Sequence, residues 1–211
     1  MATPITFETL VRAVNLPAFD PTPAHFNMSP SGRRLEPPEG IAAREAGVLE
    51  LVYPHDGVLR VVLTRRNDAL RGHSGQISFP GGRRDSTDES FTATALRETC
   101  EELGLCEGIQ VIGTISPMYI PPSNFKVYPT VGYVDAPPVF TPNEAEVAEI
   151  FSVSLDDLIN PQLKSIEERV IQGTPLNVPF YLVSGHKVWG ATAIMLSELE
   201  QRLLSAQTQT P

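Results

Sequence analysis

Three glutamates share one face of a predicted helix near the middle of the chain. They are Glu98, Glu101 and Glu102, in the segment Arg97–Leu105 (RETCEELGL). Side chains at i, i+3 and i+4 are neighbours on an α-helix, and like charges at this spacing repel by roughly 0.2–0.5 kcal/mol per pair. A hard divalent cation bound by carboxylate oxygens offsets this repulsion. The triplet therefore predicts a helix that carries a metal site.

The residues around the triplet predict the limits of this helix and its buried side. An apolar stripe at helical spacing lies opposite the glutamates, formed by Thr92, Leu96, Cys100 and Leu103. Either Asp88 or Ser90 can serve as the N-cap. Gly104 stands where a left-handed residue commonly ends a helix. We expect the helix to run from about residue 89 to about residue 103.

A solvated helix surface is the simpler interpretation of an acidic triplet, with Arg97 paired to Glu101. The preceding Gly81-Gly82 favours a binding site instead. A glycine turn lets backbone groups approach a ligand without a Cβ in the way. The glycine turn, the capped helix and the triplet together therefore favour a metal site.

Residues 82–105 resemble the box of the Nudix hydrolases. That box is a glycine, five residues, a glutamate, seven residues, then Arg-Glu-U-x-Glu-Glu-x-Gly-U, where U is aliphatic. The second half matches here, with Thr99 at the first U position and Leu105 at the second. In the first half, Gly82 and Arg97 are 15 positions apart where the pattern has 14, so the early acid is either Asp88 or Glu89.

The longer loop resembles the coenzyme A pyrophosphatase branch of the family, which has GGxxDxxDxS at this point, as Gly81–Ser90 does. A second branch pattern, LTxRxxxLRxHxGQxxFPGG, is similar to Leu63–Gly82, which reads LTRRNDALRGHSGQISFPGG. Weaker branch features lie at Ser123–Pro129, Glu146–Phe151 and Val188–Ala193. The resemblance extends from about residue 47 to the last predicted helix.

The resemblance implies a hydrolase that cleaves the pyrophosphate of coenzyme A or a derivative, giving 3′,5′-ADP and 4′-phosphopantetheine, with Mg²⁺ or Mn²⁺ as cofactor. Glu98 and Glu102 are the first candidates for direct metal ligands, and Glu101 would complete the shell, directly or through water. Arg97 would orient one of these carboxylates by charge-assisted hydrogen bonds. Gly82, by the family resemblance, would lend its carbonyl to the metal.

The general base is predicted in a later loop. Glu146, which opens the segment EVAEIF, is the first candidate, with Glu144 and Glu149 as neighbours. At least two of these three acids are expected to be solvated loop residues. Candidates for substrate contacts lie in the branch pattern: Arg65, Arg71, His73, Gln76, Ser78 and Phe79. For His73 a structural hydrogen bond is an equally good interpretation.

Composition and charge limit the classes of partner. The length of 211 residues and a hydrophobic content of 41% suit one globular domain. The net charge of −9 argues against nucleic-acid binding driven by overall charge. The chain has neither a run of 18 apolar residues nor the N-terminal pattern of a secretory signal. We expect a cytoplasmic protein with a small nucleotide substrate and no membrane partner, and the sequence leaves a homodimer open.

Local charge differs from the overall charge. Residues 59–84 contain six arginines and one acid, whereas residues 85–107 contain seven acids and one arginine. This arrangement suits a polyanionic substrate that meets a metal, although any single arginine could equally solvate a strand edge. Cys100 and Cys106 are the only cysteines. No disulfide framework is expected, and Cys100 is predicted to be a small buried hydrophobe.

The order of expected elements indicates an α/β (α+β) fold. Strands are expected at 47–53, 59–64, 109–115, 127–134, 150–153, 168–172 and 180–183, and helices at 6–14, 155–159 and 191–204. His55-Asp56-Gly57 predicts a hairpin between the first two strands. The pattern predicts a sheet covered on both sides, and the Nudix resemblance implies an αβα sandwich with a mixed β-sheet.

Residues 1–40 are predicted to form a Pro-rich N-terminal arm that is extended after its short helix, 41–204 the hydrolase domain, and 205–211 a frayed tail. Two alternative functions stay open. One is a broader Nudix pyrophosphatase acting on oxidised nucleoside triphosphates or NADH. The other is a non-catalytic Nudix-like ligand-binding module.

Overall fold

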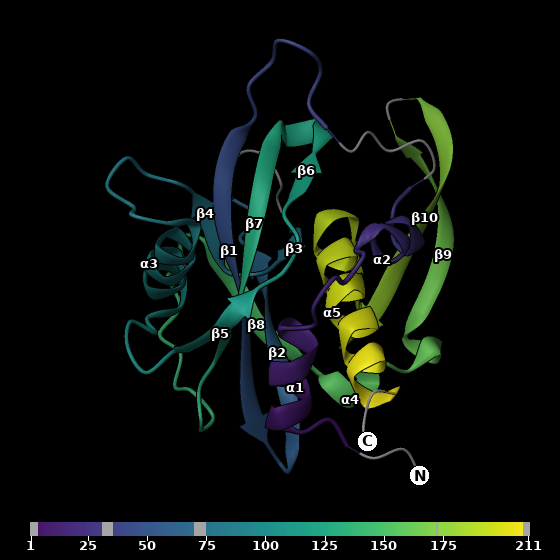
Figure 1. Cartoon of the computed structure of the whole chain (residues 1–211). Coiled ribbons are helices and arrows are strands. Elements are labelled where there is room, and N and C mark those ends of the chain that lie inside the picture. The colour runs from purple at the N-terminus through teal and green to yellow at the C-terminus, as the bar shows by residue number, and fades with distance from the viewer. Residues whose placement is uncertain (1–3, 31–35, 70–74, 172, 209–211) are drawn as a thin grey trace.

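The computed structural model describes residues 4–30, 36–69, 75–171 and 173–208 (Figure 1). A main sheet lies between helices on its two faces. Helix α3 (Phe91–Leu103) covers one face, and α1 (Phe7–Val14) and α5 (Gly190–Thr208) cover the other. Two hydrophobic clusters, one on each side of the sheet, hold these layers together. The structure confirms the predicted fold class of helices around a mixed sheet.

The main sheet has eight strands: β1 (Arg44–His55), β2 (Val58–Arg66), β3 (Ile77–Ser78), β4 (Gly81–Arg83), β5 (Gln110–Thr114), β6 (Met118–Ile120), β7 (Phe125–Tyr133) and β8 (Val147–Ser154). The central strands β1 and β7 are parallel, and the other pairs are antiparallel. Asp56 and Gly57 have φ values of 49° and 79°, which are the left-handed values of a two-residue hairpin turn. The predicted β1–β2 hairpin is therefore confirmed.

Strand β1 has different neighbours along its length. Its second half pairs with β2, whereas its first half pairs with β4 on the same side. Strand β3 pairs with the far end of β2. The short segment Phe79–Pro80 therefore crosses from one strand pair to the other. This crossing places Gly81 and Gly82 of β4 beside β1, where both strands contact α3.

A second sheet of three antiparallel strands lies on the far side of α5 (Figure 1). It contains β9 (Lys164–Ile171), β10 (Thr174–Val183) and β11 (His186–Trp189). The two late strands expected from the sequence lie within longer β9 and β10, and Gln172 lies outside the described residues. The short strands β3, β4, β6 and β11 were not predicted, because two to four residues carry too little periodicity.

Helix α5 is buried on most of its surface, since it lies between the two sheets. Its start agrees with the predicted terminal helix, but it continues to Thr208. Ala206 is only 1% exposed, so the predicted frayed tail is wrong for residues 205–208. Residues 209–211 lie outside the described residues. Among the described helices, none combines the length and the apolar character needed to cross a membrane.

The N-terminal segment is more helical than predicted. Helix α1 agrees with the expected helix at residues 6–14, but α2 (Thr22–Asn27) forms inside the stretch predicted to be extended. Pro23 lies in its first turn, where a missing N–H costs no helical hydrogen bond. Both helices contact α5. The short elements α4 (Leu155–Leu158), η1 (Pro121–Ser123) and η2 (Pro161–Leu163) complete the fold.

Candidate active site

Helix α3 is fixed at both ends by its own sequence. The Ser90 side chain accepts a hydrogen bond from the Ala93 N–H at 3.0 Å, which identifies Ser90 rather than Asp88 as the N-cap. At the other end, Gly104 adopts φ 71° and its N–H donates to the Cys100 carbonyl at 2.9 Å. The helix therefore ends where predicted and begins two residues later than predicted.

The predicted apolar stripe on α3 is confirmed at Leu103 and is wrong for the other three positions, which are only half-buried. The buried residues are Thr94, Ala95, Thr99, Glu102 and Leu103, whereas Leu96 and Cys100 are half-buried. The helix packs so closely that a Cβ at Gly47 of β1 would overlap the Phe91 carbonyl. Small residues therefore suit this contact better than larger apolar ones. In consequence, Glu102 lies against the sheet and not in solvent.

Two glycines of β4 receive the side chains of two glutamates. A Cβ at Gly82 would overlap the carboxylate of Glu98. The N–H of Gly81 donates to Oε2 of Glu102 at 3.3 Å. Gly81 has φ 152°, a conformation that residues with a Cβ rarely adopt. The structure thus brings Gly82, Glu98 and Glu102 together, as the sequence predicted.

The two glutamates lie in surroundings that favour their protonated forms. Burial raises the pKa of Glu102 to about 8, against the Gly81 hydrogen bond, and the nearby Glu98 and Glu146 charges add to the rise. Burial also raises the pKa of Glu98, which the Arg97 charge opposes. Carboxylates gathered in this way are the oxygen donors that a hard divalent cation takes. The donor chemistry at Glu98 and Glu102 therefore fits Mg²⁺ or Mn²⁺.

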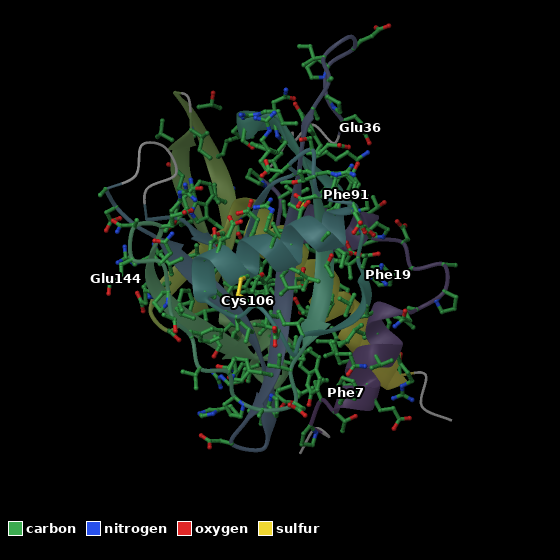
Figure 2. The ribbon with its side chains drawn as sticks, turned by 90° about the vertical axis from the view of Figure 1, so that its left-hand side faces the viewer. Phe7, Phe19, Glu36, Phe91, Cys106 and Glu144 are labelled. Atoms are coloured by element: carbon green, nitrogen blue, oxygen red, sulfur yellow. A yellow bond between two sulfur atoms is a disulfide. The ribbon has the colours of Figure 1, made fainter. Side chains whose placement is uncertain are left out.

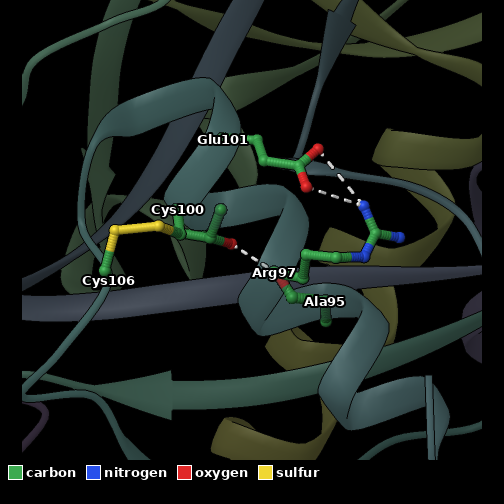
Figure 3. Close-up of a disulfide and its surroundings, with 6 residues drawn as sticks. Ala95, Arg97, Cys100, Glu101 and Cys106 are labelled. Atoms are coloured by element: carbon green, nitrogen blue, oxygen red, sulfur yellow. Dashed lines mark hydrogen bonds and ion pairs between the residues drawn. A yellow bond between two sulfur atoms is a disulfide. The ribbon is translucent and has the colours of Figure 1, made fainter. Parts of the chain in front are cut away.

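Glu101 is not brought to the same point. It is half exposed, and its carboxylate accepts hydrogen bonds from Nη1 of Arg97 at 3.2 Å (Figure 3). Among the described residues, no three acidic, histidine or cysteine side chains converge as a preassembled metal site. The pair Glu98 and Glu102, with the Gly82 backbone beside it, is the part of the predicted ligand set that the structure places together.

Arg97 joins the loop before α3 to the glutamates. Its Nε and Nη2 donate to the two carboxylate oxygens of Asp88, each at 3.0 Å, and its Nη1 lies 2.9 Å from Glu98 Oε1. These hydrogen bonds from Arg97 hold the pKa of Asp88 well below its usual range. Glu89 is exposed. Of the two candidates for the early acid, Asp88 is therefore the one that positions Arg97.

Glu146 lies close enough to the two glutamates for its charge to raise the pKa of both Glu98 and Glu102. Asn143 holds it there. The Asn143 N–H donates to the Glu102 carbonyl at 2.9 Å, and its Nδ2 donates to Glu146 Oε1 at 3.2 Å. The other two acids differ. Glu149 pairs with Arg65 and His186, and Glu144 is exposed at the surface (Figure 2).

The predicted substrate residues divide into three groups. Arg65 is paired with Asp68 at 2.9 Å and with Glu149 at 3.4 Å, so its charge is already compensated. Arg71 and His73 lie outside the described residues. Gln76, Ser78 and Phe79 line one pocket of about 270 Å³, although Phe79 is only 1% exposed and also belongs to the core.

This pocket, called the apolar pocket below, lies between β1, β3, β6, β7 and the start of α5. Most of its exposed lining is apolar. Its residues include Val48, Gln76, Ile77, Ser78, Phe79, Ile120, Ser123, Val127, Trp189, Thr192 and Met195. Val48 pairs with Gly81 across β1 and β4, so the pocket borders the strand that carries the glutamate contacts.

Arg66 is a charged residue near the site that the sequence reasoning missed. The register of β2 against β8 shifts between Arg65 and Arg66, and such a bulge re-aims a side chain. The Arg66 charge lowers the pKa of Glu102. Its Nε is buried without a hydrogen-bond partner among the described residues. The pattern LTxR places its arginine at position 66, so the signal was present one residue after the arginine chosen.

The two cysteines form a disulfide, contrary to the prediction of a buried free thiol (Figure 3). Cys100 in the last turn of α3 bonds to Cys106 in the segment that follows, with a Cα–Cα distance of 4.4 Å. The left-handed turn at Gly104 reverses the chain and brings Cys106 back to the helix. The half-buried position of Cys100 leaves room for this bond.

Comparison with known proteins places this architecture among characterised folds. The NUDIX domain model matches residues 43–173. A protein named as the uncharacterized Nudix hydrolase NudL of Pectobacterium atrosepticum is 39% identical over 159 residues, which cover 74% of this chain and 81% of that protein. The protein of the same name from Photorhabdus laumondii is 36% identical over 144 residues, covering 68% and 76%.

Solved structures show the same fold at lower identity. The Nudix hydrolase RenU from M. smegmatis superposes with a TM-score of 0.53 and 21% identity, covering 85% of this chain and 98% of that one. A MutT/nudix family protein from Enterococcus faecalis also reaches a TM-score of 0.53, with 14% identity, covering 97% and 76%. At these identities the likeness concerns the fold alone.

Proposed function

The chain belongs to the NUDIX family, which implies hydrolysis of a pyrophosphate bond, and we propose that its substrate is coenzyme A or a derivative. The products would be 3′,5′-ADP and 4′-phosphopantetheine or its acyl or oxidised form. The observation that carries the proposal is the placement of Glu98 and Glu102 against Gly81 and Gly82. The two abutting sequence patterns of the coenzyme A branch support the choice of substrate.

The roles of the residues follow from their contacts. Glu98 and Glu102 would hold Mg²⁺ or Mn²⁺, with the Gly82 carbonyl as a further oxygen donor. When bound, the ion neutralises phosphoryl oxygens and makes a water more acidic. Arg97 keeps the Glu98 carboxylate in place through its ion pair at 2.9 Å. Glu146 is proposed to accept a proton from the attacking water as general base.

The apolar pocket supports a substrate with an uncharged arm. Phe79, which lines it, lies three residues before Gly82, so their Cα atoms are at most about 11 Å apart. A substrate whose diphosphate lies at Gly82 can therefore place an adjoining arm in this pocket. The pantetheine arm of coenzyme A is long and carries no phosphate beyond the diphosphate. A pocket with mainly apolar lining suits such an arm and excludes a charged one.

Product analysis tests the proposal. The purified protein is incubated with coenzyme A and Mg²⁺, beside an EDTA control and parallel reactions with NADH and a nucleoside triphosphate. Metal-dependent release of 3′,5′-ADP from coenzyme A is the expected result. Cleavage of only the other substrates would identify a broader Nudix pyrophosphatase, and cleavage of none would identify a ligand-binding module.

Variants of the glutamates test the site separately from the substrate. We expect Glu98→Gln and Glu102→Gln each to reduce turnover at least about 100-fold, since even outer partners of metal ligands contribute about 10–100-fold. Glu144→Gln, an exposed acid at the surface, is the matched control and should keep its activity. Equal activity in all three variants would remove the proposed ligands.

A further inference from the structure

A second, more polar pocket of about 480 Å³ lies beside β4, on the far side of Gly82 from the Phe79–Pro80 crossing. Its charged lining residues are Arg44, Glu45, Arg83, Arg84 and Asp85, and it is called the arginine pocket below. Arg44 and Glu45 begin β1, and the other three follow Gly82 along the chain. The pocket is therefore built by the start of β1, the end of β4 and the loop that leads from β4 into α3.

The three arginines of this pocket differ from the ion-paired arginines of the described residues. Arg65, Arg97, Arg169 and Arg202 each form ion pairs with carboxylates. Within the part of the chain that the structure describes, the guanidinium groups of Arg44, Arg83 and Arg84 form no ion pair. Three positive charges without an ion-pair partner among the described residues therefore line one concavity, in a chain of net charge −9.

Two of these arginines are held by aromatic rings. The Arg44 guanidinium lies 4.2 Å from the centre of the Phe125 ring and donates to the Ser123 carbonyl at 2.6 Å. The Arg84 guanidinium lies 4.8 Å from the centre of the Phe91 ring. The Nε and Nη2 of Arg84 also donate to the Asp88 carbonyl, at 3.4 and 3.1 Å. These contacts order both guanidinium groups, and each keeps further N–H donors for a phosphate.

The acids of the pocket do not cancel this charge. The Glu45 carboxylate accepts a hydrogen bond from the Tyr128 hydroxyl at 3.2 Å. Asp85 is exposed, and its backbone N–H donates to Asp88. The lining thus keeps three positive charges against two negative ones, with the positive groups free of ion pairs.

The arginine pocket lies directly beside the proposed diphosphate position. Gly82 and Arg83 are consecutive in β4, and Nη2 of Arg97 donates to the Arg83 carbonyl at 3.2 Å. Side chains alternate between the faces of a strand, so Arg83 points away from α3 when Gly82 faces Glu98. Ser123, which accepts from Arg44, also lines the apolar pocket. The two pockets therefore share this border.

We propose that the arginine pocket binds a phosphate of the substrate that is separate from the diphosphate, namely the 3′-phosphate on the ribose of coenzyme A. This inference rests on the proposed function. A phosphate dianion is strongly disfavoured in a mainly apolar pocket but is matched by arginine forks. With the diphosphate at Gly82, each end of the substrate has its own pocket. The nucleotide end lies in the arginine pocket, and the pantetheine arm lies in the apolar pocket.

Calorimetry with the two nucleotides 3′,5′-ADP and 5′-AMP tests the pocket without any need for turnover. The wild-type protein is expected to bind 3′,5′-ADP roughly 10-fold to 100-fold more tightly, the range expected from one or two hydrogen bonds to a charged group. Arg83→Ala and Arg44→Ala should reduce this preference about tenfold. Lys187→Ala, which removes one positive charge from the second sheet, should leave the preference unchanged.

Kinetics with coenzyme A and 3′-dephospho-coenzyme A provide the second arm. In Arg83→Ala, kcat/KM should fall about tenfold more for coenzyme A than for the dephospho substrate. Equal losses for the two substrates, or equal affinity of the wild-type protein for 3′,5′-ADP and 5′-AMP, would overturn the inference. If the protein cleaves no diphosphate, the proposed function fails, and the calorimetry still decides whether the pocket recognises the 3′-phosphate.

Discussion

Glu102 combines burial, a single backbone hydrogen bond and two acidic neighbours. It is 7% exposed, accepts from the Gly81 N–H and lies near Glu98 and Glu146. Desolvation of its charged form raises the pKa to about 8 from the ordinary 4.5. The carboxylate therefore carries its proton near neutral pH unless a cation replaces that proton. This competition makes the metal-free protein sensitive to pH.

We expect the free energy of unfolding to fall as the pH rises from about 5 to about 8 when EDTA is present. A carboxyl group whose folded pKa is raised stabilises the fold in its protonated form, and this contribution is lost as the pH passes from the unfolded to the folded pKa. Glu102→Gln should reduce the slope, as measured by chemical denaturation across this range. Glu144→Gln serves as the control, and an unchanged slope in Glu102→Gln would contradict the assignment.

Asn143 connects the last turn of α3 to the proposed general base. It binds the Glu102 carbonyl through its N–H and Glu146 through Nδ2, and its Oδ1 accepts from the Ala145 N–H at 3.2 Å. We expect Asn143→Ala to lower kcat about tenfold, with a smaller effect on KM, because the base loses its orientation.

A double-mutant cycle distinguishes this positioning role from a structural one. In a Glu146→Gln background, Asn143→Ala should lower kcat by less than about twofold, since the group that Asn143 orients has already been removed. If Asn143→Ala lowers kcat equally in both backgrounds, Asn143 does not act through Glu146. Melting temperatures of all four proteins provide the check on folding.

At the residue scale, the sequence predicted the pairings that depend on local spacing and missed those that depend on distant chain. The proximity of Gly82 to Glu98 follows from the motif and is present in the structure. The hydrogen bond from the Gly81 N–H to Glu102, and the compensation of Arg65 by Glu149, depend on strand register, which spacing along the chain does not reveal. Arg66 enters the site through a bulge, which no periodicity marks.

At the scale of elements, α3 is held along its whole length. Ser90 caps its start, Ala95 and Leu103 pack on β1, and the Glu102 and Leu103 carbonyls accept from Asn143 and Thr141. The disulfide from Cys100 to Cys106 closes the last turn. The last turn carries Glu102, so its order matters for this proposed metal ligand.

Loss of the disulfide should lower stability by about 2 kcal/mol, from the loop-closure estimate for a short loop. For a chain of this length, this corresponds to a decrease of roughly 4–8 °C in Tm. Calorimetry of the wild-type protein with and without reductant measures the change, and Cys106→Ser should show no response to reductant. A wild-type Tm that is insensitive to full reduction would contradict this prediction.

The positions of long elements were predictable, whereas the buried face of α3 was not. Hydrophobic periodicity located α1, β1, β2, β7 and α5, because each is long or bounded by strong turn residues. The face of α3 was misassigned because close approach to Gly47 selects small side chains. Hydrophobicity ranks Leu96 above Thr99, but the available space reverses that order.

At the scale of the whole molecule, segments outside the family match complete the fold. The NUDIX match covers residues 43–173, whereas α1, α2 and α5 cover one face of the sheet. A buried network joins them around Glu198. Its carboxylate lies 2.7 Å from His25 Nε2 and 2.9 Å from Arg202 Nε, and accepts from the Ser116 N–H at 3.0 Å.

We expect Glu198→Ala to destabilise the protein by about 3–5 kcal/mol, because it leaves the buried Arg202 charge without its partner. Urea denaturation of the variant and the wild-type protein measures this. Glu8→Ala, at an exposed position of α1, is the control, with a change within about 0.5 kcal/mol. A loss as small as that of the control would show that the network contributes no net stability.

The Pro-rich composition near the N-terminus suggested an extended arm, yet the same residues form α2 on α5. Composition reports the average tendency of a stretch, whereas the fold depends on one buried contact. Here Ala24 is 1% exposed and its carbonyl accepts from Ser197 at 2.8 Å. Such long-range contacts explain why the domain core was easier to predict than the segments that enclose it.

The two proposed substrate pockets would have a consequence for turnover. A substrate held at both ends is a bivalent ligand, because each bound end raises the effective concentration of the other. Hydrolysis at the centre cuts the link between the ends. Each product then keeps only one anchor and its weaker affinity. The same arrangement would thus bind the intact substrate more tightly than either product. Cleavage itself would therefore promote dissociation of the products.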